Sequence, residues 1–176
     1  MEKSVNHKKD IAFVLDTRTV NKTKKHYVLE ANDTQKENLK KFFELPAIKN
    51  LSFEFDVFLN KDCIEINGIL KAVVTQKCVV SLNEFDEKIN EGVRLLFTED
   101  EALYQSLLKT EDFSLEDEDV ELIEKGKIYF YDLVQEQLGL ALNPFPKKTD
   151  EAFSYYELKA EEVKENPFSV LKHLTK

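Results

Sequence analysis

The sequence predicts an α+β protein in which a curved antiparallel sheet of about five to seven strands, open or closed like a barrel, packs against two main helices. Three observations lead to this class. Apolar and polar residues alternate over 51–59, as in a half-buried strand. Shorter apolar runs precede and follow this segment. Residues 34–45 and 130–142 instead carry apolar side chains at helical spacing.

Length and composition favour one domain. The chain has 176 residues, 42% of them hydrophobic, which is near the size at which one core forms. We therefore expect a single domain over 1–176, with 147–176 as a partly helical C-terminal extension. No apolar run approaches the roughly 18 residues of a membrane-spanning helix, so a cytoplasmic location is predicted. Cys63 and Cys78 are too few for a disulfide scaffold, and we expect both to be reduced.

The first fifty residues predict two strands and a helix. Apolar runs at 11–15 and 25–29 indicate the strands. Thr34 and Glu37 have the spacing of a capping box, in which a hydroxyl and a carboxylate bond the free amides of a helix start. A helix is therefore expected over 34–45, ending before the proline that follows.

The middle of the chain predicts the main part of the sheet. Four successive strands are expected over 51–59, 64–74, 78–82 and 89–97. At Gly68 the alternation slips by one residue, which indicates a β-bulge. Short polar turns between the strands favour an antiparallel meander with one face on a core.

The last third predicts more helices than strands. Its expected elements are a helix at 103–108, a hairpin joining 120–123 to 127–129, a helix over 130–142 and a short helix from Asn166. The acidic run 111–119 is expected to be a solvated loop. Calcium loops need a fixed order of ligands around a central glycine, and this run has no glycine.

Charge is unevenly distributed along the chain. The formal net charge is −9, yet residues 1–50 hold 11 Lys or Arg against 7 Asp or Glu, while 51–176 hold 14 against 27. Because phosphate binding needs clustered basic residues, RNA contact would fall near the N-terminus. The candidates for RNA contact are Lys22, Lys24, Lys25, Lys40 and Lys41. A solvated lysine-rich surface is the simpler interpretation.

No catalytic motif is present. The chain has no glycine-rich phosphate loop, no Gly-x-Ser-x-Gly and no His-Glu-x-x-His. The three histidines lack an evident orienting partner. Cys78 lies in an apolar run, where a cysteine more often packs than reacts. We therefore predict no catalytic residue.

Three stretches together carry a family resemblance. They are GKIYFYDLVQEQLGLALNPFP at 126–146, Thr-Gln-Lys-Cys at 75–78 and Asn-Pro-Phe-Ser-Val-Leu at 166–171. In this order they resemble the YceD-like family, bacterial proteins linked to accumulation of large-subunit ribosomal RNA. The resemblance extends from Ile66 to Leu171.

The resemblance implies a non-enzymatic factor in ribosome biogenesis that supports synthesis, processing or stability of large-subunit ribosomal RNA. A ribosomal or rRNA-maturation protein is the expected partner, with acidic residues 111–119 meeting basic groups on it. Direct RNA binding is the second possibility. Two other classes stay open: a small-molecule-binding β domain, and a cysteine-dependent enzyme using Cys78.

Two departures from the family pattern bear on site residues. Many members have Cys-x-x-Cys where this chain has Thr75 and Cys78, so one thiolate is left, and we expect no zinc and no other cofactor. The family usually has an aspartate after Gly-x-Ile, where this chain has Tyr129. The helix-capping role is therefore expected at Asp132. The interaction candidates are Lys77, Cys78, Phe130, Asp132, Asn166, Pro167 and Phe168.

Overall fold

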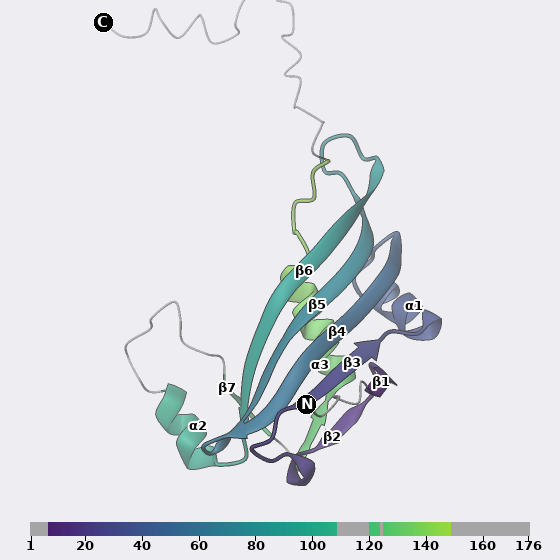
Figure 1. The fold of residues 1–176 in the computed structure, drawn as a ribbon. Helices are drawn as coiled ribbons and strands as arrows, with labels where there is room; N and C mark the ends of the chain where they lie inside the picture. Colours follow the sequence, from purple (N-terminus) through teal and green to yellow (C-terminus); the bar gives the residue numbers. More distant parts are fainter. Residues whose placement is uncertain (1–6, 109–119, 124, 149–176) are drawn as a thin grey trace, which may run out of the picture.

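A computed structural model of the chain describes residues 7–108, 120–123 and 125–148. Within these residues, six strands form one sheet in the order β1-β3-β4-β5-β6-β7 (Figure 1). They are β1 (His7–Asp10), β3 (Lys25–Glu30), β4 (Ala47–Asn60), β5 (Cys63–Lys77), β6 (Glu84–Thr98) and β7 (Val120–Leu122). A small second sheet pairs β2 (Val14–Asp16) with β8 (Lys127–Tyr129). The helices are α1 (Asp33–Phe42), α2 (Glu101–Leu108) and α3 (Phe130–Ala141), with a 3-10 turn, η1, at Thr17–Thr19.

The α+β class is confirmed, and the sheet differs from the prediction at its two edges. Strands β3 to β6 are antiparallel, but β1 runs parallel to β3 and β7 parallel to β6. A parallel pair needs a crossover connection. Between β1 and β3 the chain crosses to β2 in the small sheet and returns. The two edge strands do not pair with each other, so the sheet is open and not a barrel.

The core lies between α3 and one face of the sheet (Figure 1). Phe130, the first residue of α3, is fully buried, and its ring centroid lies 4.6 Å from that of Phe55 in β4 and 5.6 Å from that of Phe13. Backbone bonds fix this helix start, because Phe130 N–H donates to Phe13 O at 3.1 Å and β8 pairs with β2. Leu133, Val134 and Leu138 continue the buried stripe, as the helical spacing predicts.

Gly68 is explained by close packing, and the predicted bulge there is wrong. It stands opposite Phe55 in an unbroken register. A Cβ atom on Gly68 would lie 2.5 Å from both Glu54 O and Phe55 Cβ, closer than real contacts allow. The register shift of this strand pair lies instead between Ile48 and Asn50.

The predicted strand at 78–82 is also wrong. These residues form the turn between β5 and β6, closed by bonds from Cys78 N–H to Asn83 O and from Leu82 N–H to Cys78 O, both 2.9 Å. Leu82 has a φ of 62°, which a strand does not allow. The apolar run suggested a buried strand, but Val79 and Leu82 are exposed at the tip of the turn.

Three smaller predictions need correction. The capping box is formed by Asn32 and Gln35, two residues before the predicted pair, because asparagine is a stronger N-cap residue than threonine and starts the helix earlier. The segments at 120–123 and 127–129 do not form a hairpin, since β7 pairs with β6 and β8 with β2. The first predicted strand, 11–15, is displaced: β1 ends at Asp10 and β2 begins at Val14.

We expect Gly68→Ala to destabilise the fold by about 1–3 kcal/mol, because the added methyl group overlaps β4. Gly92→Ala is the matched control, since Gly92 lies in the adjacent strand β6 and an added Cβ meets nothing within 4 Å. It should change the free energy of unfolding by less than about 0.5 kcal/mol. Urea unfolding of the two variants measures both values, and equal losses would contradict the packing role of Gly68.

Candidate functional site

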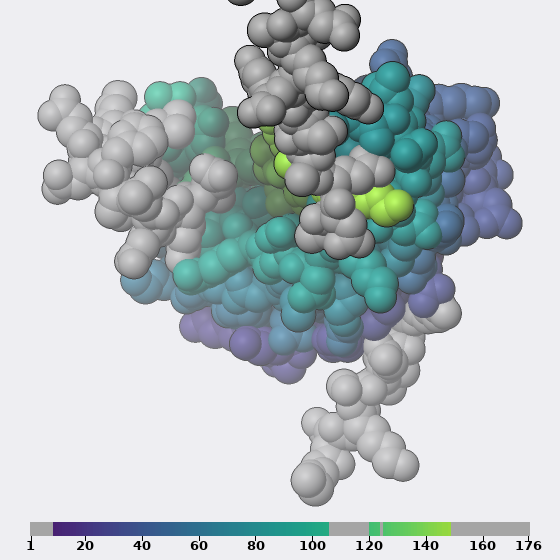
Figure 2. Space-filling model, turned by 90° about the horizontal axis from the view of Figure 1, so that it is seen from above, coloured from purple at the N-terminus to yellow at the C-terminus, as the bar shows by residue number. Residues whose placement is uncertain are grey.

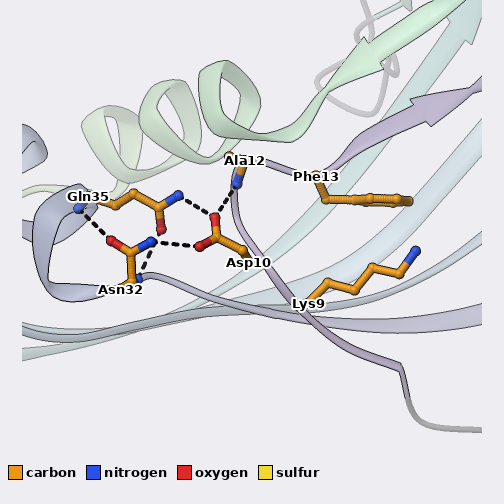
Figure 3. A pocket seen from close by; sticks show the side chains of 6 residues that line it. All are labelled: Lys9, Asp10, Ala12, Phe13, Asn32 and Gln35. Carbon is orange, nitrogen blue, oxygen red and sulfur yellow. Dashed lines mark hydrogen bonds between the residues drawn. The ribbon is translucent and has the colours of Figure 1, made fainter.

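A shallow hollow of about 450 Å³ lies between the end of β1 and the start of α1 (Figure 3). Its lining residues are Lys9, Asp10, Ala12, Phe13, Asn32 and Gln35. Parallel pairing of β1 with β3 brings these two segments together, because Asp10 stands opposite Glu30, shortly before the helix begins. No spacing rule in the sequence links residues 9–13 to 32–35, so the sequence analysis missed this hollow.

Asp10 in this hollow is occupied by structural bonds. Its carboxylate accepts from Ala12 N–H at 2.8 Å, from the Asn32 amide at 2.6 Å and from the Gln35 amide (Figure 3). These donors, the Ala12 N–H first, hold the pKa of Asp10 below its ordinary value. Asn32 and Gln35 are the two members of the capping box of α1. Asp10 therefore anchors the helix start and is poorly suited to act as a general base.

Lys9 is the charged group of the hollow whose ammonium is not used in a hydrogen bond or ion pair with another described residue. Its Nζ lies 3.7 Å from the centroid of the Phe13 ring and 4.9 Å from that of Tyr27, which are cation–π distances. Burial lowers the pKa of Lys9. Within the described residues it has no hydrogen-bond or ion-pair partner. The hollow thus offers an ammonium group placed over an aromatic ring, which suits it to holding an anionic group rather than to acid–base chemistry.

The structure does not bring the predicted interaction candidates together. Lys77 is exposed at the end of β5, and Cys78 begins the turn that follows. Phe130 and Asp132 lie at the other end of α3 from that turn, with Phe130 in the core and Asp132 exposed in the first helical turn. Asn166, Pro167 and Phe168, like the acidic run 111–119, lie outside the described residues.

The predicted RNA-contact lysines also fall into two groups. Lys22, Lys24 and Lys25 lie before or at the start of β3, where Lys25 stands opposite Val57 near one end of β4. Lys40 and Lys41 lie in the last turn of α1, just before β4 begins at its other end. Both face Glu37, at 3.2 and 4.0 Å. The structure therefore does not form one cluster from these five residues.

Cys78 combines a shifted pKa with complete burial. Hydrogen bonding from the Ser81 side chain lowers the pKa of the Cys78 thiol, and backbone amides add to the effect. Yet its exposed fraction is 0%. Thr75, at the position of the missing cysteine, donates its hydroxyl to Asp86 at 2.8 Å. Among the described residues, no three His, Cys, Asp or Glu side chains converge as metal ligands would.

Residues 66–175 match the family described as "Large ribosomal RNA subunit accumulation protein YceD". The chain belongs to the YceD family. This confirms the resemblance, and the family description connects the chain to accumulation of large-subunit ribosomal RNA. Searches of curated proteins and of solved structures gave no significant match. None of the described helices is long and apolar enough to cross a membrane.

The YceD match begins inside the sheet. The first matched residue, Ile66, is the fourth residue of β5 and stands opposite Val57 in β4. Strands β1, β3 and β4 and helix α1 precede the match, yet they belong to the same sheet and core. The preceding residues therefore supply part of the sheet that the YceD region completes and that α3 covers.

Thiol labelling of the native protein tests the environment of Cys78. We expect a maleimide reagent to modify half-buried Cys63 at least about tenfold faster than Cys78, which should react only through opening or unfolding of the β5–β6 turn. Labelling in denaturant, where both should react, is the control. Rapid native labelling of Cys78 would instead restore the case for a cysteine nucleophile.

Proposed function

We propose that this chain is a non-enzymatic factor of ribosome biogenesis that supports accumulation of large-subunit ribosomal RNA through contact with a ribosomal or rRNA-maturation protein in the cytoplasm. The YceD family match over residues 66–175 carries the proposal. The proposed role acts on the synthesis, processing or stability of that RNA.

The distribution of charge favours a protein partner over RNA. On the sheet face that α3 leaves uncovered, charges of both signs pair: Lys71 with Glu54 at 3.2 Å, and Arg94 with Glu65 at 3.3 Å. A protein that binds RNA through its phosphates needs a cluster of unpaired basic groups. The lysines predicted for that role lie at opposite ends of β4 instead. Because the charges on this face are already paired, it offers little basic surface to phosphates, which favours a protein partner over RNA.

The reactive groups of the fold favour a non-enzymatic role. Asp10 caps α1 through Asn32 and Gln35, so its use as a base would weaken the helix start. The Cys78 thiol is covered by the β5–β6 turn and the segment after α3. Both arrangements serve folding. An activity that used either group would first require local opening.

Depletion of the protein in its native cell tests the proposed function. We expect the ratio of large- to small-subunit ribosomal RNA to fall by about half or more and large-subunit precursors to change, because an accumulation factor acts on one subunit. Wild-type protein and Cys78→Ala should both restore the ratio, since no thiol chemistry is proposed.

Two outcomes would contradict the proposal. An unchanged RNA ratio after verified depletion would remove the ribosomal role. Failure of Cys78→Ala to restore it, with Cys63→Ala restoring it and both variants equally stable by urea unfolding, would point to cysteine-dependent chemistry. Co-sedimentation of the protein with large-subunit precursors, reduced at high salt, is the expected sign of direct attachment.

A further inference from the structure

The most exposed apolar side chains of the described residues gather at one end of the molecule. These five, here called the apolar end, are Phe42, Val79, Leu82, Leu140 and Phe145, with exposed fractions of 63%, 52%, 65%, 74% and 76%. The other large apolar side chains that are exposed reach at most 48%. Scattered exposed apolar residues are ordinary, but a group at one place indicates a contact surface.

Three segments far apart in the sequence form the apolar end. Val79, in the β5–β6 turn, donates its N–H to Pro146 O at 2.9 Å, which places the turn beside Phe145. Phe43, next to Phe42 in the chain, lies so close to Gly139 that a Cβ there would be 3.1 Å from its ring. Figure 2 looks onto this end, with the turn in teal, α1 in blue and the residues before 148 in yellow-green.

Two buried hydrogen-bond acceptors without partners lie beneath the same end. They are Oε1 of Gln76, whose side chain is 4% exposed, and Oε2 of Glu87. In the β5–β6 register Gln76 stands opposite Phe85 and Glu87 opposite Val74, so the two side chains are diagonal neighbours on the covered face. Buried acceptors are almost always bonded. These two acceptors therefore leave unsatisfied hydrogen-bonding capacity beneath this end.

We propose that residues 149–176 of this chain fold back and cover the apolar end. The described chain stops at Lys148, two residues after the bond between Val79 and Pro146, so the segment starts at the edge of this surface. Phe168, Leu171 and Leu174 are spaced three residues apart, as on one face of a helix. The family match continues to residue 175, so this segment is part of the family pattern.

Charge and reach are compatible with this occupant. Residues 149–176 hold 6 Asp or Glu against 4 Lys, and the surface next to them presents exposed Lys77, Lys147 and Lys148. A chain of this length with random-coil dimensions would have a root-mean-square span of about 30 Å, enough to return across one end of the domain. Tethering gives an effective concentration of about a millimolar, so even a weak contact would be occupied. A second copy of the chain lacks this advantage.

Site-specific photo-crosslinking in the full chain tests the proposal. p-Benzoylphenylalanine in place of Phe42, far from the segment in sequence, should form intramolecular crosslinks to residues 166–175, identified by mass spectrometry. The same group in place of Tyr129, which is 48% exposed at the start of α3, is the matched control and should give at least about tenfold less. Phe168→Ser with Leu171→Ser keeps the tether and should lower the Phe42 yield at least several-fold.

Each other outcome overturns the proposal. Crosslinks between two chains would assign the apolar end to a second copy. Absence of crosslinks to 166–175, or a yield unchanged by Phe168→Ser with Leu171→Ser, would leave this surface to another partner. Because the crosslinks are measured in the purified protein, their failure is independent of the ribosomal RNA ratio in depleted cells.

Discussion

The fold depends on the contact of Phe130 with aromatic rings from two other parts of the chain. Phe130 begins α3 immediately after β8, and it stacks on Phe55 from β4 and on Phe13 from the segment between β1 and β2. Its position therefore decides how the helix crosses the sheet and where the first residues attach. Truncation of a buried phenylalanine costs about 3–5 kcal/mol, a large share of the stability of an ordinary domain. The small sheet of β2 and β8 adds the backbone bonds that hold this start of the helix in place.

Features encoded by local periodicity were predictable, and features that depend on distant partners were not. Alternation over 51–59 and helical spacing over 130–142 correspond to β4 and α3 because each pattern reports one covered face. The turn at Cys78 to Leu82 has the composition of a strand, but bonds within the turn and a bond to the distant Pro146 fix its conformation. The parallel edges and the hollow beside Lys9 arise from crossovers that leave no local signal. The family, in contrast, was predictable because its short motifs keep their order along the chain.

The proposed docking surface is composite. The family match starts at residue 66, yet Phe42 of the apolar end precedes it, while Leu82, Leu140 and Phe145 lie within it. Helix α1 reaches this end because Asn32 and Gln35 fix its start and the chain then enters β4. The segment proposed to cover this end, residues 149–176, lies within the match except for its last residue.

Hydrogen exchange of the native protein tests most directly whether the residues before the family match and the matched region form one cooperative unit around Phe130. The account predicts that the slowest amides of β3 and β4 and those of β6 and α3 exchange with the same free energy of opening, and that Phe130→Ala lowers both by the same amount. Separate opening of β3 and β4 at a clearly lower free energy, or a Phe130→Ala effect confined to α3, would contradict it.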